Sequence, residues 1–313
     1  MDETPPDLNT SEEALARKFK EAGFIGVGFL GAEACEFGAW NQEWLARGFE
    51  ADMNWTHNHQ GIRQNPLTME PWAKSIIALA FPYKTAPPKG WEVERPISRY
   101  AWGMDYHKEL VRLIKPIITE LKLELKDTHP NLQMRICVDS APLPEKLIAQ
   151  RAGLGFIGRN SLLIHPSYGS FVFLVEILTN LELKTSEAYQ GPDCGGCKEC
   201  LDHCPGGAIT ADGFVNAKLC ASYLTIEKKG ELTKIEKKIT KHRLFGCDSC
   251  QDCCPYNHAA PTQEASPFLP LERWQGVNAE LVKSWTEADF ETLKINSPLK
   301  RAGLAGLKRN AGG

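Results

Sequence analysis

Cysteine residues offer the most specific chemistry in this sequence. The chain has 11 cysteines, and nine of them lie between Cys194 and Cys254. The run "CGGCKECLDHCP" at 194–205 has the spacing C-x2-C-x2-C-x3-C-P. In this pattern three thiolates bind one cubane iron–sulfur cluster and the fourth binds its neighbour. Zinc is the alternative, although zinc sites usually pair two C-x2-C units. The spacing therefore predicts two iron–sulfur clusters.

The second run, "GCDSCQDCCPYN" at 246–257, has one cysteine more than it needs. Adjacent Cα atoms are only about 3.8 Å apart, so Cys253 and Cys254 leave no chain to reach from one cluster to the next. Aligning the two runs on their prolines makes Cys253 a spare thiol and leaves Cys220 as the missing ligand. We predict one cluster on Cys194, Cys197, Cys200 and Cys254, and the other on Cys204, Cys220, Cys247 and Cys250.

The rest of the composition is that of an ordinary globular protein. The chain is 42% hydrophobic and 24% charged, with a formal net charge of −3, which argues against nucleic-acid binding over the whole surface but allows a local basic patch. The acidic start and the lack of a long apolar run predict a cytoplasmic protein with no membrane contact. Clustered thiols in such a protein indicate metal ligands rather than disulfides. Cys35 and Cys137 are expected to pack as small apolar residues, with a redox thiol as the alternative for Cys137.

The elements that must position these groups alternate between buried strands and helices. Thr10 and Glu13 form a candidate capping box, and Pro116 marks a kink or break in a long helix. Strands are expected at 24–30, 75–81, 132–139 and 170–178, and helices at 11–22, 33–47, 105–125 and 144–151. This alternation predicts an α/β layered domain.

Composition divides the chain into three segments. Residues 1–185 carry the α/β pattern, and 186–260 are rich in Cys and Gly, so that metal ligation must replace a core. Residues 261–313 form a helical carboxyl-terminal segment whose tail, "SPLKRAGLAGLKRNAGG", has four basic residues and no acidic ones. This tail is either a solvated helix end or a nucleic-acid contact.

Asp139 is the best candidate for a reactive side chain outside the cysteines. It lies at the carboxyl end of an expected strand, just before a helix, which is where α/β folds place ligands. A helix-capping role explains it equally well. Gly153, Gly155 and Gly158 follow, but they match a dinucleotide-binding fingerprint poorly.

Four stretches together resemble the epoxyqueuosine reductase family. They are "VDSAPLPEKLIAQRAGLGFIGRNSLLIHPSYGS" (138–170), "SRYAWGMDYHKEL" (98–110) and the two cysteine runs. The resemblance covers most of the chain and implies a corrinoid-binding fold like that of reductive dehalogenases, joined to a ferredoxin-like module with two [4Fe-4S] clusters. It also implies cobalamin as cofactor and reduction of epoxyqueuosine in tRNA. The expected partners are the tRNA anticodon stem-loop and an external electron donor of the flavodoxin or ferredoxin type. The protein is expected to be a monomer.

The same resemblance assigns roles to particular residues. The family's proton donor corresponds to Asp139, a role that requires a raised pKa. Residues expected to support the cofactor and substrate are Asp105, Tyr106 and His107, with Arg63, Arg99, Arg159, Asn160 and Ser170 as further candidates for holding corrinoid or tRNA phosphate. The first three also fit the start of an amphipathic helix, and surface exposure is the usual fate of arginine.

Two departures from the family pattern affect these expectations. The family usually has a small apolar residue where this chain has Cys253. Many members also continue into a helical repeat domain, so part of any tRNA-binding surface is expected to be absent or differently built. Competing functions are an electron carrier, a reductive dehalogenase and a zinc-stabilised RNA-binding module.

Overall fold

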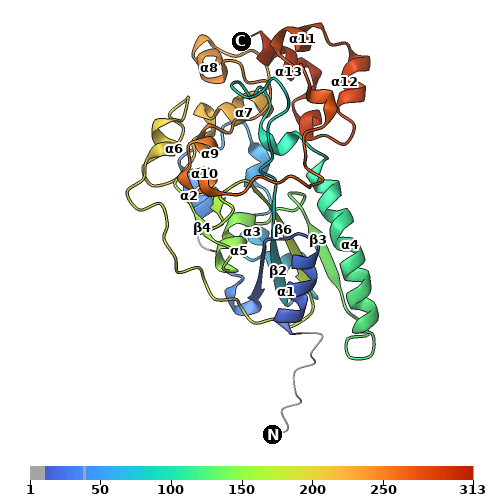
Figure 1. The fold of residues 1–313 in the computed structure, drawn as a ribbon. Coiled ribbons are helices and arrows are strands. Elements are labelled where there is room, and N and C mark those ends of the chain that lie inside the picture. Colours follow the sequence, from blue (N-terminus) through green and yellow to red (C-terminus); the bar gives the residue numbers. More distant parts are fainter. Residues whose placement is uncertain (1–10, 38–39, 313) are drawn as a thin grey trace.

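A four-stranded sheet forms the centre of the larger lobe in this computed structural model, which describes residues 11–37 and 40–312 (Figure 1). The strand order is β1-β2-β6-β3, and every neighbouring pair is antiparallel. The strands are β1 (Gly26–Gly31), β2 (Ser75–Pro82), β3 (Met134–Cys137) and β6 (Val172–Thr179). All four expected strands are therefore present. A separate hairpin joins β4 (Phe156–Ile157) to β5 (Leu163–Ile164).

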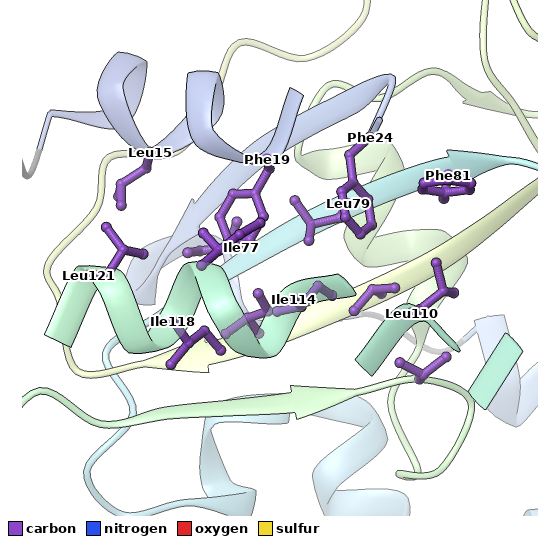
Figure 2. Close-up of a cluster of buried hydrophobic side chains, with 14 of the residues drawn as sticks. Leu15, Phe19, Phe24, Ile77, Leu79, Phe81, Leu110, Ile114, Ile118 and Leu121 are labelled. Carbon is purple, nitrogen blue, oxygen red and sulfur yellow. The ribbon is translucent and has the colours of Figure 1, made fainter. Parts of the chain in front are cut away.

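Two helices cover one face of this sheet. They are α1 (Glu12–Glu21) and α4 (Tyr106–Glu124). Figure 2 shows Leu15 and Phe19 of α1 facing Ile114 and Leu121 of α4 over the side chains of β2. Apolar residues at helical spacing bury this face and supply most of its stability.

The ends and the interior of these two helices differ in detail from expectation. Ser11 caps α1 by accepting a hydrogen bond from the Ala14 amide, whereas the expected cap at Thr10 lies outside the described residues. Helix α4 continues through Pro116, so the proline does not end it.

The opposite face of the sheet is covered by α5 (Glu145–Arg151), whose Ile148 and Ala149 are buried. The approach is close, because a Cβ at Gly28 of β1 would collide with the Ala152 carbonyl. The helix expected over 33–47 is shorter: a 3-10 turn spans Ala32–Ala34 and α2 spans Trp40–Ala46. Helix α3 (Gln60–Gln64) follows it.

Short helices fill the remainder of the chain. The cysteine-rich segment contains α6 (Glu199–Asp202), α7 (Ala221–Ile226), α8 (Lys234–Thr240), α9 (Ser249–Asp252) and α10 (Pro255–Ala259). The carboxyl-terminal helices α11 (Ala279–Ser284), α12 (Glu287–Leu293) and α13 (Gly303–Ala311) gather at the end of the molecule away from α1 (Figure 1). Further 3-10 turns span Asn54–His57, Pro66–Met69, Arg99–Ala101, Ala217–Leu219, Glu272–Trp274 and Pro298–Arg301. Within the described ranges, no helix is both long and apolar enough to cross a bilayer.

The carboxyl-terminal helices share a core with residues from the middle of the chain. Trp102 and Ile97 pack with Trp274, Leu299 and Leu307. Helix α13 is therefore a packed element, and its basic residues are not all free for a ligand. Arg309 donates to the carbonyls of Leu224, Lys228 and Gly230.

Candidate functional site

The cysteines form two groups of four. Cys200 interacts with Cys194, Cys254 and Cys197. Burial, followed by the charges of these three thiols, raises the pKa of the Cys200 thiol to about 11. Cys250 interacts in the same way with Cys247, Cys220 and Cys204. These are the two sets that the proline alignment predicts. Helices α6 and α9, one from each cysteine run, contact each other and bring the runs together.

Cys253 lies beside the first group without completing it. Burial, followed by the charges of Cys200 and Cys254, raises the pKa of the Cys253 thiol to about 12. It ends α9, while Cys254 is the first residue of the turn into α10 and is buried. Among the described residues, no three His, Cys, Asp or Glu side chains converge tightly enough to hold a single metal ion. A [4Fe-4S] cluster would be held by all four thiols of a group.

The second cysteine group forms one wall of a cavity of ≈ 580 Å³. Its lining is mainly apolar, including Leu163, Val172 and Ala221. It shares Tyr100, Ile226 and Glu227 with a larger cavity of ≈ 960 Å³. The lining of the smaller cavity includes Cys204, Cys220, Cys247 and Cys250 but none of the first group. The two cavities therefore adjoin at these three residues, and the second cysteine group lines the smaller one.

Asp139 faces the larger cavity from the turn that follows β3. Its φ of 48° is left-handed, a region that Asp adopts more readily than most residues. The turn is fixed by a hydrogen bond of 2.9 Å from the Asp139 amide to Oε1 of Glu145 at the start of α5. The Asp139 side chain is 61% exposed, so it is open to a ligand.

Two aromatic side chains at the start of α4 contact the Asp139 carboxylate. The Tyr106 hydroxyl donates to Asp139 Oδ2 at 2.6 Å, and His107 Nε2 lies 3.6 Å from the same oxygen. His107 Nδ1 is 2.7 Å from Oδ1 of Asp105, which is buried and caps α4. A histidine held between two carboxylates donates from both ring nitrogens when protonated.

This arrangement sets the charges of the pair. Removal from water would lower the pKa of His107, but its contacts with Asp105 and Asp139 outweigh that effect and raise the pKa to about 9. For Asp139, removal from water would raise the pKa, but the interactions with His107 and Tyr106 lower it below the ordinary value. At neutral pH the proton of this pair is therefore on His107 and Asp139 is ionised. The raised pKa that a donor role requires of Asp139 is not found in this ligand-free arrangement.

The other candidate residues lie in different places. Asn160 and Ser170 line the smaller cavity, and Ser170 Oγ donates to Gln251 at 3.0 Å. Arg63 lines the larger cavity, and its buried Nε has no partner among the described residues. Arg159 instead donates to the carbonyls of Ala211 and Gly195, outside both linings.

Arg99 is enclosed in the protein. Its guanidinium lies 4.7 Å from the Trp102 ring and 4.6 Å from the Phe171 ring. It also donates to the Thr85 carbonyl and to Asp252. Arg99 therefore joins the sheet lobe to the cysteine-rich segment and is not available for phosphate.

Two acidic residues behind Asp139 were not identified from the sequence. Glu145 lines the larger cavity, and Glu176, in the middle of β6, is completely buried. Glu176 is the only charged residue in the run "SFVFLVEIL" (170–178). The available sequence signal was a lone carboxyl group in an otherwise apolar strand. Burying such a group without a partner is energetically unfavourable, so its presence there points to a specific role.

Comparisons with known proteins identify the family of this chain. The family model described as "Epoxyqueuosine reductase QueG, DUF1730" matches residues 63–140, and the model described as "4Fe-4S double cluster binding domain" matches residues 193–257. An epoxyqueuosine reductase from Gloeobacter violaceus is 35% identical over 98% of this chain and 95% of its own length. One from Synechocystis is 40% identical over 86% of this chain and 92% of its own.

Solved structures lead to the same result. The epoxyqueuosine reductase of Streptococcus thermophilus matches with a TM-score of 0.81 at 29% identity, over 97% of this chain and 80% of that one. A structure of epoxyqueuosine reductase with an epoxyqueuosine-modified tRNA-Tyr stem loop matches with a TM-score of 0.82 at 29% identity, over 96% of this chain and 79% of that one. With a double [4Fe-4S] cluster-binding domain and relatives of this similarity over nearly its full length, the chain belongs to the epoxyqueuosine reductase family of oxidoreductases.

Proposed function

We propose that this protein reduces epoxyqueuosine to queuosine at the wobble position of tRNA. The observation that carries the proposal is the pair of adjoining cavities, one lined by the second cysteine group and the other by Asp139. In the proposed reaction, the cluster on that cysteine group would supply electrons and Asp139 would deliver a proton. The relative solved with an epoxyqueuosine-modified tRNA stem loop supports the choice of substrate.

Cobalamin is the proposed cofactor, and the cavities suit it. Sites for drug-sized ligands are about 300–1,000 Å³, so adjoining cavities of ≈ 960 and ≈ 580 Å³ offer room for a large cofactor beside a nucleoside. Asn160, Ser170 and the apolar wall would hold the corrinoid, and the unpaired Nε of Arg63 would meet an anionic group. When bound in its cobalt(I) form, a corrinoid supplies a strong nucleophile and reductant.

The order of electron transfer follows from the cavity wall. Only the second cysteine group lines the space proposed for the cofactor. Electrons from an external flavodoxin or ferredoxin would therefore enter at the cluster on Cys194, Cys197, Cys200 and Cys254. They would leave through the cluster on Cys204, Cys220, Cys247 and Cys250.

Protonation of the departing oxygen is assigned to Asp139. The reduction consumes two electrons and two protons and releases water. Because Asp139 is ionised in the free protein and His107 carries the proton, Asp139 acts as a relay that takes a proton from His107 and gives it to the substrate. A bound cofactor and base would displace water from the carboxylate and favour its protonated form.

The tRNA would be held at the mouth of the larger cavity. Trp55 is 49% exposed there and offers a ring on which an extruded base can stack. Lys300 and Arg301, the two basic residues at the start of the tail, lie on the same rim. Lys300 would contact phosphate, whereas Arg301 donates to both carboxyl oxygens of Glu227 at 2.8 Å. Lys308 and Arg309 lie outside this cavity lining.

The test is anaerobic reconstitution with cobalamin and a reductant, followed by mass spectrometry of nucleosides from epoxyqueuosine-containing tRNA. Queuosine should form, and Asp139→Asn should slow its formation roughly 10²–10⁴-fold, the usual contribution of a positioned proton donor. Iron content and cobalamin binding should not change. Asp127→Asn, in an exposed loop, is the matched control. Reduction of a partner protein without queuosine formation would instead support an electron carrier.

A further inference from the structure

Glu176 is a buried carboxyl group without a hydrogen-bond donor among the described residues. It is 0% exposed in the centre of the sheet, opposite Cys137 of β3 and Ala78 of β2. Neither of its carboxyl oxygens receives a hydrogen bond from an N–H or O–H group of the described residues. An isolated ionised carboxyl group in such a position costs several kcal/mol, roughly, so the group is expected to keep a proton.

The neighbour of Glu176 is a second carboxyl group. The side chains of Glu176 and Glu145 are within hydrogen-bonding contact, and each affects the titration of the other. Two carboxylates are both acceptors, so this contact needs a shared proton. Burial, followed by the charge of Asp139, raises the pKa of Glu145 to about 8. Burial and then Glu145 raise the pKa of Glu176 well above its ordinary value.

The charged and titratable groups around Glu145 and Glu176 do not replace a shared proton. Lys146 is next to Glu145, but its Nζ donates to the Ser161 carbonyl at 2.6 Å. Arg63 interacts with Glu145 only through its charge. The Cys137 thiol faces the pair and stays neutral, because burial raises its pKa to about 11. Tyr106 is hydrogen-bonded to Asp139.

The pair is connected to the reaction site. Glu145 accepts the Asp139 amide and lines the cavity that the Asp139 side chain faces. A proton on the Glu145 carboxyl therefore reaches that cavity without crossing packed protein. Glu176 is fully buried and does not line that cavity, so it lies behind Glu145.

We propose that Glu145 and Glu176 share one proton and that this pair supplies, through Asp139, the second proton of the reduction. The inference rests on the proposed function. Both carbon–oxygen bonds of the epoxide break, a carbon–carbon double bond forms, and the oxygen leaves as water. Two electrons come from the external donor through the clusters. His107 provides one of the two protons and the glutamate pair provides the other, and water in the cavity then refills both.

Glu176→Gln is the decisive variant, because it keeps the shape of the side chain but gives Glu145 an amide donor in place of a shared proton. Infrared spectroscopy of the reconstituted protein should show a protonated carboxylic acid band at about pH 7 that the variant lacks. The single-turnover rate at about pH 9 should fall about tenfold, since above the pKa of the pair each unit of decrease in that pKa lowers the protonated fraction about tenfold. The alkaline limb of the pH profile should move to lower pH.

Glu109→Gln is the matched control, since Glu109 is also buried but pairs with Arg112 away from the cavities. If Glu176→Gln does not fold, Glu145→Gln should give the same infrared and kinetic changes. An unchanged acid band or an unchanged pH profile in a folded variant would overturn the inference. If the native protein forms no queuosine but shows the acid band, the proposed function fails while the shared proton remains.

Discussion

His107 is held between two carboxylates, and this position determines how Asp139 can act. A protonated imidazole donates to Asp105 and forms an ion pair with Asp139, so its charge favours the ionised form of Asp139. In the proposed reaction, the proton for the substrate is therefore held one side chain away from Asp139, which would deliver it.

The charge of His107 predicts a pH-dependent contribution to stability. Its folded-state pKa of about 9 lies above the ordinary value of about 6.5, so the stabilisation is complete below about pH 6.5 and is lost as pH rises through about 9. His107→Gln should therefore lower the free energy of unfolding in urea at about pH 6, and the difference from the native protein should shrink by about pH 9.5. The native turnover rate should also decline through about pH 9.

His129→Gln, on the loop after α4, provides the comparison, because its ring contacts only Thr128 in the described structure. A constant difference between native and His107→Gln proteins from about pH 6 to about 9.5 would contradict the assigned charge.

At the residue scale, the sequence predicted the groups with a recognisable spacing and missed those without one. Each cysteine run ends in a proline that fixes the alignment of the two runs. Counting the cysteines back from these prolines predicts the two sets of four. Asp139 was selected from its place at the end of an expected strand, whereas Tyr106 and His107 were found only through family resemblance. The structure brings the three together. Glu176 has no motif around it, and its partner Glu145 is 31 residues away in sequence, so only the fold reveals the pair.

At the element scale, the boundary between α9 and α10 separates two adjacent thiols. Cys253 ends α9 with helical backbone angles, while Cys254 begins the next turn in an extended conformation with ψ of 125°. The two side chains therefore leave the backbone differently, and Cys254 is buried with the first cysteine group while Cys253 stays beside it. This change of backbone conformation gives the two adjacent cysteines different positions relative to the first cysteine group.

Cys253→Ala should consequently keep both clusters, whereas Cys254→Ala should lose one. After anaerobic reconstitution, the first variant should contain about eight iron atoms per chain and the second about four. Iron analysis and the visible absorption spectrum measure this directly. Equal iron loss in the two variants would show that the proline alignment assigns the wrong thiol.

The elements themselves were predictable where hydrophobic runs are long. All four strands of the sheet follow from apolar runs, and α1, α4 and α5 follow from periodicity and capping. Strand direction did not follow, because antiparallel neighbours here are connected by long segments instead of hairpins. The helix expected over 33–47 is divided into a 3-10 turn at Ala32–Ala34 and α2 at Trp40–Ala46.

At the scale of the whole molecule, the division into segments 1–185, 186–260 and 261–313 remains a prediction. In the structure, side chains from different segments pack against one another. Residues 91–102 of the first segment join the core of the carboxyl-terminal helices. The smaller cavity is lined by the sheet lobe on one side and the cysteine-rich segment on the other. A cofactor in that space would contact both, so its binding should depend on the cluster nearest to it.

Replacing one ligand from each cysteine group separates this effect from iron loss alone. Cys220 lines the smaller cavity and Cys194 does not. Each substitution, Cys220→Ala and Cys194→Ala, should remove about four of about eight iron atoms. Only Cys220→Ala should also weaken cobalamin binding, by roughly tenfold or more, because it disrupts the cavity wall. Absorption titration of each anaerobically reconstituted variant with cobalamin measures the difference. Equal affinities in the two variants would place the cofactor elsewhere and break the proposed order of electron transfer, since the second cluster would then have no contact with the group it reduces.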